Sequence, residues 1–390
     1  MKDFFKKIVV KIITKEARGA LKRRAPIVVA ITGSVGKTST KDAIAAALTG
    51  ASSESVRKSE KSFNSDIGVP LAILGLKNAW NNPFGWLKNI IAGFFAAHSK
   101  NFPKILVLEI GADHPGDISS VAKWLRADVV VFTAMASVPV HIEFFGSPEK
   151  VLEEKVSLLK ALKKYGTIVV NGNDEKFLNA AKNSGKKFIT YGEKENEPRE
   201  LPVLAALAVV FALGFDIEKA KKALAAHESP AGRMKTLKGI RGSTVIDDTY
   251  NSSPIAAESA LQTLKNMKKN SRKIAVLGDM KELGDYSRDA HYKIGKRVAD
   301  SANVFFAVGQ FAKYFAQGAI DGGMAPAKIY EFHTSIEAGK KLENIIRQGD
   351  IVLVKGSQSM RMEKIVKMVM EDKSRAKELL VRQEKEWERR

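Results

Sequence analysis

A short glycine-rich loop is the part of this sequence whose residue types point most directly to chemistry. An apolar run at 27–31 leads into Gly33, Ser34, Val35, Gly36, Lys37, Thr38 and Ser39, and a helix-forming stretch follows at 38–48. Glycines let backbone N–H groups close around phosphate oxygens, the lysine neutralises their charge, and the threonine hydroxyl is a suitable magnesium ligand. The helix would point its positive N-terminus at the same anion. We therefore expect these seven residues to bind the phosphates of a nucleotide.

The loop is shorter than the general P-loop. That motif has four residues between its glycines, whereas this sequence has two, and Ile31 stands where the first glycine would be. An ordinary turn is the alternative interpretation. The strand predicted before the loop and the helix predicted after it favour a nucleotide site.

Three further residues lie where an open α/β sheet would bind a ligand, at or after the carboxyl ends of predicted strands. Glu109 closes the apolar run at 105–110, where a buried carboxylate is costly unless it holds a cation or a partner. His141 follows a predicted strand, and Lys155 lies in a predicted helix. Taken alone, the alternatives are a structural ion pair for Glu109, a core or surface histidine, and a solvated lysine.

Apolar runs alternate with helical patterns from Pro26 onward, which is typical of parallel sheets covered by helices. A chain of 390 residues is also longer than one hydrophobic core usually serves. Strands are predicted at 27–31, 105–110, 129–133, 167–171, 243–247, 273–277, 304–308 and 351–355, and helices at 38–48, 148–162, 204–213, 255–267, 287–299 and 362–370. The predicted fold class is therefore α/β.

Four regions follow from this pattern. Residues 26–232 are predicted to form a P-loop-type central domain with a mostly parallel sheet, and residues 233–372 a Rossmann-like α/β C-terminal domain. The junction is expected near 228–238, where Ser229-Pro230-Ala231-Gly232 breaks a helix. Residues 1–25 are predicted to be a basic amphipathic helix and residues 373–390 a charged, solvated helical tail.

The charge balance favours anionic partners. Lys plus Arg number 64 against 43 Asp plus Glu, a formal net charge of +21. An anionic membrane surface is one candidate partner for residues 1–24, whose apolar side (Phe4, Phe5, Ile8, Val9, Ile12 and Ile13) faces away from several lysines. Docking of that side on the protein is the alternative. A second apolar cluster at 80–95 is either core or a lipid-facing patch.

The sequence does not favour a membrane-spanning or a nucleic-acid-binding protein. No run approaches the roughly 18 apolar residues of a membrane span. The absence of cysteine is compatible with a reducing compartment, so we expect a cytoplasmic location, peripheral at the inner membrane face if the basic helix binds lipid. Without aromatic platforms or a known reading motif, nucleic acid is the poorer partner.

Eight segments, in this order, resemble the Mur ligase family, the ATP-dependent amide-forming enzymes of peptidoglycan precursor synthesis. The similarity is closest to the members that add D-alanyl-D-alanine. The segments are residues 33–40, 62–70, 108–117, 141–146, 232–234, 247–254, 277–284 and 354–362.

The resemblance implies that ATP phosphorylates a substrate carboxylate and that an amine attacks the acyl phosphate. It implies magnesium, two ions in all, bound by Thr38, Glu109, His141 and a carbamylated Lys155. Arg233 would reach the nucleotide phosphates, while Asp247, Tyr250, Asn251 and Pro254 would line the ribose and adenine. The implied substrates are a muramyl-peptide acceptor and a dipeptide facing 355–357, and we expect a monomer.

Two departures from the family pattern leave alternatives open. Only about 25 residues precede the first predicted strand, so the N-terminal domain that holds the acceptor's uridine diphosphate is expected to be missing. The family's additional strands and His-Asn motif are also absent between Tyr191-Gly192 and the helix at 204–213. The alternatives are a related ligase acting on another acceptor or amine, and an inactive nucleotide-binding scaffold at the membrane surface.

Overall fold

The computed structural model describes residues 2–60, 63–79, 82–136, 138–139, 141–193, 196, 200–268, 270–384 and 387, with side chains from residue 8 onward. Ser62, Trp80, the side chains of Phe4 and Phe5, and most of 385–390 therefore lie outside the described residues. The chain divides into two compact units. Unit 1 comprises 1–135 and 144–227, and unit 2 comprises 136–143 and 228–390.

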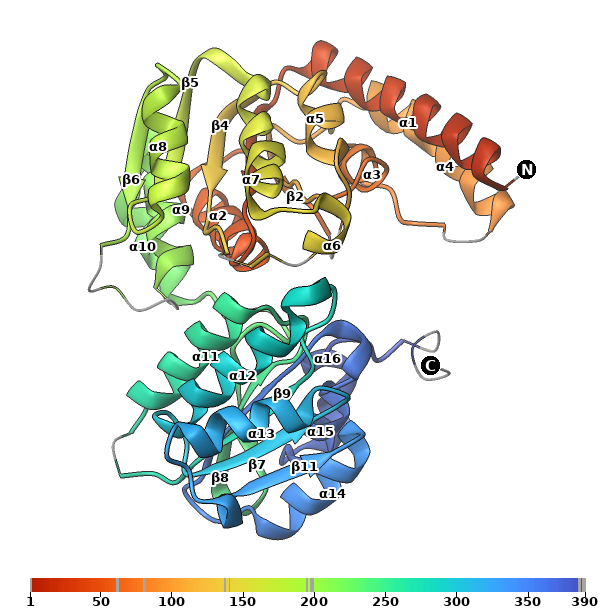
Figure 1. Ribbon diagram of the computed structural model, residues 1–390. Helices are drawn as coiled ribbons and strands as arrows, with labels where there is room; N and C mark the ends of the chain where they lie inside the picture. The colour runs from red at the N-terminus through yellow and green to blue at the C-terminus, as the bar shows by residue number, and fades with distance from the viewer. Residues whose placement is uncertain are drawn as a thin grey trace. The chain divides into compact units, whose positions relative to one another are not determined.

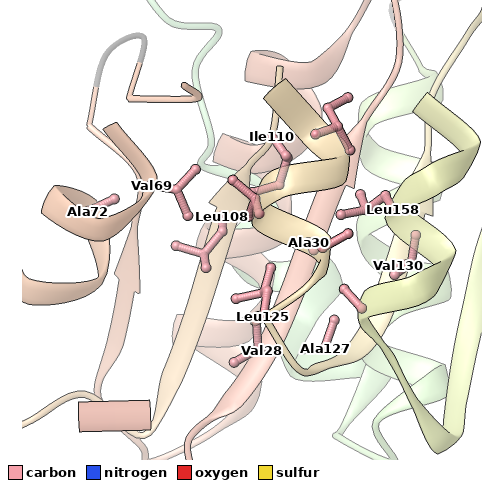
Figure 2. Packing of buried hydrophobic residues seen from close by; sticks show 14 of the residues in the cluster. Val28, Ala30, Val69, Ala72, Leu108, Ile110, Leu125, Ala127, Val130 and Leu158 are labelled. Atoms are coloured by element: carbon pink, nitrogen blue, oxygen red, sulfur yellow. The ribbon is translucent and has the colours of Figure 1, made fainter. Parts of the chain in front are cut away.

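Unit 1 is built on a six-stranded parallel sheet in the order β2-β3-β1-β4-β5-β6 (Figure 1). Its strands are β1 (Ile27–Thr32), β2 (Val56–Lys58), β3 (Ile105–Glu109), β4 (Ala127–Phe132), β5 (Leu162–Asn171) and β6 (Phe188–Tyr191). Successive residues of β1 alternate between two hydrophobic cores, because both faces of the sheet are covered by helices. Val28 and Ala30 pack with Leu108 and Val130 in one of these cores (Figure 2).

The helices of unit 1 fall into two sets by the core that they cover. Helices α2 (Lys37–Ala51), α9 (Leu201–Ala212) and α10 (Ile217–Ala225) cover one face. The other face is covered by α1 (Lys2–Arg24), α3 (Gly68–Leu74), α5 (Asp117–Ala122), α7 (Pro148–Val156), the 3₁₀ turn η1 (Ser157–Ala161) and α8 (Glu175–Asn183). Helix α4 (Pro83–His98) packs on α1, and the short α6 (Ile142–Phe145) crosses from unit 2 into unit 1.

Unit 2 has its own six-stranded sheet, in the order β11-β10-β9-β12-β8-β7, parallel except for the edge pair β7–β8. Its strands are β7 (Lys235–Gly239), β8 (Ser243–Asp248), β9 (Lys273–Gly278), β10 (Val304–Val308), β11 (Ile329–Phe332) and β12 (Ile351–Lys355). Helices α11 (Pro254–Asn266), α12 (Ser287–Ala299) and α13 (Ala312–Asp321) cover one face, and α14 (Ser335–Ile345), α15 (Glu363–Val369) and α16 (Ala376–Leu379) the other.

The predicted α/β class with mostly parallel sheets is confirmed, but two local predictions differ from the structure. The helix predicted at 148–162 ends at Val156, because η1 and then β5 take over the remaining residues. The tail is not one solvated helix. Among the tail residues that the structure describes, the turn at Lys373–Arg375 leads into the short helix α16 (Ala376–Leu379), residues 380–384 are not helical, and Ala376, Leu380 and Arg382 are buried.

The two apolar clusters near the N-terminus also differ in burial. Val9 and Ile13 of α1 are buried in the core, so this part of its apolar side docks on the protein. Large side chains of α4 are exposed instead, and only the smallest residues of that helix are buried. Among the described residues, no helix combines the length and apolarity needed to cross a bilayer.

Candidate active site

The glycine loop connects β1 to α2 and is held rigidly by its neighbours. Gly33 has φ +150°, and a Cβ there would lie 1.9 Å from the hydroxyl of Thr133, so only glycine fits. Gly36 precedes α2 with φ 84°, in the left-handed region. Ser34 and Val35 both donate backbone N–H groups to the carbonyl of Ala134, at 2.7 and 3.3 Å. These contacts fix the loop against the end of β4.

Because Ala134 engages the amides of Ser34 and Val35, the part of the loop suited to an anion is the start of α2. The first amides of an α-helix have no carbonyl acceptor within the helix, and the helix dipole adds positive potential. Lys37 extends over the same loop, with its ammonium 2.8 Å from the carbonyl oxygen of Gly33 and 3.3 Å from that of Ser34. The geometry is that of an anion cradle formed mainly by Gly36, Lys37 and the residues after them.

Glu109 lies beside this cradle at the end of β3, where it pairs in register with Ile31 of β1. The carboxylate is buried, and it accepts hydrogen bonds from the Thr38 hydroxyl at 3.0 Å and from the Asn64 amide at 3.4 Å. The buried ammonium of Lys41 lies 3.9 Å away. The sequence prediction did not single out Lys41, although it lies four residues after Lys37 and thus on the same side of α2.

The pairing of Thr38 with Glu109 fits part of a magnesium site. Magnesium in nucleotide sites is usually held by one or two protein oxygens, with phosphate oxygens and water completing the shell. Among the described residues there is no group of three or more His, Asp or Glu side chains placed to hold a metal ion. The donor set therefore suits an ion shared with a phosphate ligand rather than one enclosed by the protein.

Lys155 brings a second lysine to the loop. Helix α7 begins with Ser147 capping Lys150 N–H and with Pro148 in its first turn, and this places Lys155 in the last turn, where it is buried. Its Nζ donates to the Gly33 carbonyl at 3.1 Å, the same oxygen that accepts from Lys37. Burial, together with the positive charge of Lys37, lowers the pKa of Lys155 to about 7.

A second group of predicted residues lies together in unit 2. Asp247, at the end of β8, is buried and accepts from Gly232 N–H at 3.0 Å and from the Thr249 hydroxyl at 2.6 Å. Burial raises the pKa of Asp247 to about 6, against the lowering effect of those hydrogen bonds. The guanidinium of Arg233 stacks on the ring of Tyr250, with 4.0 Å from Cζ to the centroid.

The rest of this segment is held by buried charges. Lys355 is buried and donates to Asp248 at 2.6 Å and to the Asn251 carbonyl at 2.9 Å. Its ammonium therefore holds the turn after β8 instead of facing open solvent. Pro254 lies in the first turn of α11, where Ser253 caps the helix.

Arg382 is a residue that the sequence prediction missed, because it was assigned to a solvated tail. Its guanidinium is buried, donates to the carbonyls of Thr249 and Tyr250 at 2.5 to 3.1 Å, and pairs with Glu363 at 3.1 Å. No local sequence signal identifies this role. Through Arg382, the C-terminal segment thus stabilises the backbone at Thr249 and Tyr250, in the predicted nucleotide-binding turn.

His141 falls in unit 2, whereas the phosphate loop falls in unit 1. It belongs to the segment 136–143 of unit 2, and its Nδ1 lies 2.9 Å from the carboxylate of Glu282. Both residues have positive φ, 65° and 64°, a conformation that costs non-glycine residues about 1 to 2 kcal/mol each. Within unit 1 the structure brings together Gly33 to Ser39, Glu109 and Lys155, and within unit 2 it joins His141 to Glu282.

Comparisons with known proteins identify the family of both parts of the chain. Residues 31–212 match the family model "Mur ligase middle domain", and residues 232–358 match "Mur ligase, glutamate ligase domain". Over 385 residues the chain is 26% identical to the UDP-N-acetylmuramoyl-tripeptide--D-alanyl-D-alanine ligase of Bacillus subtilis, covering 91% of this chain and 78% of that one.

Two solved structures share the fold. The structure of MurF from Acinetobacter baumannii aligns with a TM-score of 0.75 at 24% identity, covering 92% of this chain and 79% of that one. The MurF ligase from Thermotoga maritima in complex with ADP aligns with a TM-score of 0.73 at 24% identity, covering 92% and 83%.

Proposed function

Since two domain models of one family together match most of its length, this protein belongs to the Mur ligase family, and from that premise we propose that it is an ATP-dependent amide ligase. The observation that carries the proposal is the convergence of Lys37, Thr38, Glu109 and Lys155 on one rigid glycine loop. A binding scaffold would need only the loop. The buried amine of Lys155 and the buried carboxylate of Glu109 beside it are costly to keep unless they take part in chemistry.

The substrates we propose follow the relatives. The ligases to which the chain is similar carry names that describe joining D-alanyl-D-alanine to a UDP-N-acetylmuramoyl-tripeptide. We assign the same reaction type here: a carboxylate of the muramyl peptide takes the γ-phosphoryl group of ATP, and the dipeptide amine then displaces phosphate to form the amide.

The residues of unit 1 have distinct roles in this proposal. Lys37 and the first amides of α2 bind and orient the phosphates. Thr38 and Glu109 would hold magnesium, which supplies positive charge to the phosphate oxygens during transfer. Lys155, with a pKa of about 7, is about half neutral amine at pH 7, and the neutral amine is the form that reacts with carbon dioxide to give a carbamate. A carbamate would replace a cation by an oxygen donor next to the loop.

The residues of unit 2 are assigned to the nucleotide and to a second magnesium. Asp247, Asn251 and Pro254 would line the ribose and adenine, with Arg233 and Tyr250 stacked beside them. With its Nδ1 paired to the carboxylate of Glu282, His141 would offer its other ring nitrogen, Nε2, to the ion. The basic helix α1 would place the enzyme at an anionic membrane surface.

The test is product formation by the full-length protein. Purified enzyme with ATP, magnesium, UDP-N-acetylmuramoyl-tripeptide and D-alanyl-D-alanine should release phosphate and give the pentapeptide mass only when both substrates are present. Lys37→Ala should abolish turnover, and Lys123→Ala, an exposed lysine of unit 1, should not. Phosphate release without dependence on the dipeptide refutes the named amine, and a panel of other acceptors and amino acids identifies the related ligase instead.

Carbamylation is tested separately. Wild-type activity should fall in buffer depleted of carbon dioxide and recover when bicarbonate is added. Lys155→Gln should be inactive under both conditions. Equal wild-type activity with and without bicarbonate would contradict the carbamate while leaving the ligase assignment intact.

A further inference from the structure

Helix α4 carries its large apolar side chains on the outside of unit 1. The exposed fractions are 81% for Phe84, 57% for Leu87, 54% for Ile91, 55% for Phe94 and 68% for Phe95. Their spacing of three, four, three and one residues places them on one side of the helix. We call these five residues the α4 stripe. A helix that only completed a core would bury such residues.

The opposite side of α4 is fixed in place, so the stripe cannot turn inward. Gly93 and Ala97 are buried, and a Cβ on Gly93 would lie 2.2 Å from the Glu16 carboxylate of α1. At the end of α4 the guanidinium groups of Arg23 and Arg24 donate to the carbonyls of Ala97 and His98, at 3.3 and 2.5 Å. The two helices thus lie side by side through their small residues (Figure 1).

The surroundings of the α4 stripe are basic. Residues 2–24 contain nine lysines and arginines against two acidic residues, and the exposed ones from residue 8 onward include Lys11, Lys15, Arg18 and Lys22, spaced along one side of α1. Lys88 is exposed within the span of the stripe, and the sequence has no acidic residue between Asp66 and Glu109.

This charge decides between possible occupants of the stripe. A second copy of a chain with a net charge of +21 would bring like charges together at this surface. An anionic bilayer complements both features, because its headgroups attract the lysines and its acyl boundary accepts the apolar side chains.

We propose that the α4 stripe inserts into the interface of an anionic lipid bilayer, with the lysines and arginine of α1 on the headgroups. Helix α4 then lies in the membrane plane as the inserting element, and α1 backs it. This refines the proposed membrane partner, on which it rests, from the charge of residues 1–24 to a defined apolar surface on another helix. It is independent of the ligase chemistry.

The experiment is vesicle flotation with the full-length protein. Wild type should bind vesicles of phosphatidylglycerol and phosphatidylethanolamine and bind phosphatidylcholine vesicles weakly. The variant Ile91→Gln/Phe94→Gln/Phe95→Gln keeps good helix formers and should lower the partition coefficient roughly tenfold or more. Phe211→Gln, which alters an exposed phenylalanine on α9, should bind as wild type does. Unchanged far-ultraviolet circular dichroism and solution ligase activity would show that the triple variant is folded.

The outcomes distinguish binding to an anionic membrane by charge alone from insertion of the α4 stripe. If Lys11→Gln/Lys15→Gln/Lys22→Gln loses binding while the α4 triple variant retains it, charge alone holds the protein and the insertion of α4 is refuted. If wild type binds no vesicle, both the membrane partner and the insertion fail, whatever the ligase assay shows. Concentration-dependent dimerisation that the α4 variant abolishes would also overturn the proposal, because a second copy would then cover the stripe.

Discussion

Replacing Lys155 by methionine should remove a pH dependence of stability from unit 1. The buried amine has a pKa of about 7, against 10.5 for an ordinary lysine. The two pKa values differ by about 3.5, and a difference of one in pKa is worth about 1.36 kcal/mol. Keeping the amine charged in the folded protein therefore lowers the free energy of unfolding by about 5 kcal/mol. Methionine has similar length and no charge, and the Gly33 carbonyl keeps its bond from Lys37.

Proton binding by the folded and unfolded chains sets the direction in which stability changes with pH. Between pH 7 and pH 10.5 the unfolded lysine holds a proton that the folded one has largely lost, so the contribution of Lys155 to stability becomes more favourable as pH rises. The cost is full below pH 7 and disappears above about 10.5. From pH 7 to pH 9, the contribution of Lys155 to the free energy of unfolding rises by about 2 kcal/mol. The difference in unfolding free energy, wild type minus the Lys155→Met variant, should therefore increase by about 2 kcal/mol over this interval.

The assay is urea unfolding in buffers freed of carbon dioxide, so that the amine is not carbamylated. Tryptophan fluorescence in a Trp387→Phe background reports on unit 1, because the other three tryptophans, Trp124 among them, fall within its residues. Other titrating groups are shared by the two proteins and cancel in the comparison. Parallel pH profiles, within about 0.5 kcal/mol, would refute the assignment of a depressed pKa to Lys155.

Three further predictions follow from contacts in the two units. Gly33→Ala should abolish ATP binding in calorimetry, because the new Cβ would collide with Thr133. The control is Gly185→Ala, where φ is positive but the space is open; it should cost only about 1 to 2 kcal/mol of stability and leave ATP binding unchanged. Glu109→Gln should raise the magnesium concentration needed for half-maximal activity by about tenfold or more, and an unchanged requirement would remove this carboxylate from the metal site. Arg382→Ala should raise the KM for ATP more than it lowers kcat, with partial rescue in Arg382→Lys, and equal unfolding of both variants without a KM change would mean a purely structural role.

The sequence was most informative where local rules decide the structure. The apolar run, glycine turn and helix at 27–48 predict β1, the loop and α2 because strand period, glycine conformation and helix propensity all act over a few residues. The close approach of Lys155 to Gly33, by contrast, joins residues 122 positions apart. No spacing rule reports such a contact, and only the family resemblance singled out this lysine.

The failures have a common physical cause, which is that burial depends on the tertiary neighbours. The charged composition of residues 373–390 favours solvent, yet Arg382 is buried because Glu363 and two backbone carbonyls meet its guanidinium. The segments 2–24 and 80–95 both carry apolar residues at helical spacing. In α4, however, Gly93 and Ala97 are the buried residues that allow a close approach to α1, and five of its large side chains stay exposed. The pattern of α1 thus indicated its buried side, whereas that of α4 did not.

The central claim is that the loop between Gly33 and Thr38 brings ATP to a substrate carboxylate that then becomes an acyl phosphate. The most direct measurement follows oxygen: the muramyl-peptide carboxylate is labelled with ¹⁸O, and the phosphate released during ligation is analysed by mass spectrometry. We expect one labelled oxygen in each phosphate formed, because the carboxylate oxygen leaves with the phosphoryl group. Unlabelled phosphate accompanying amide formation would contradict this account.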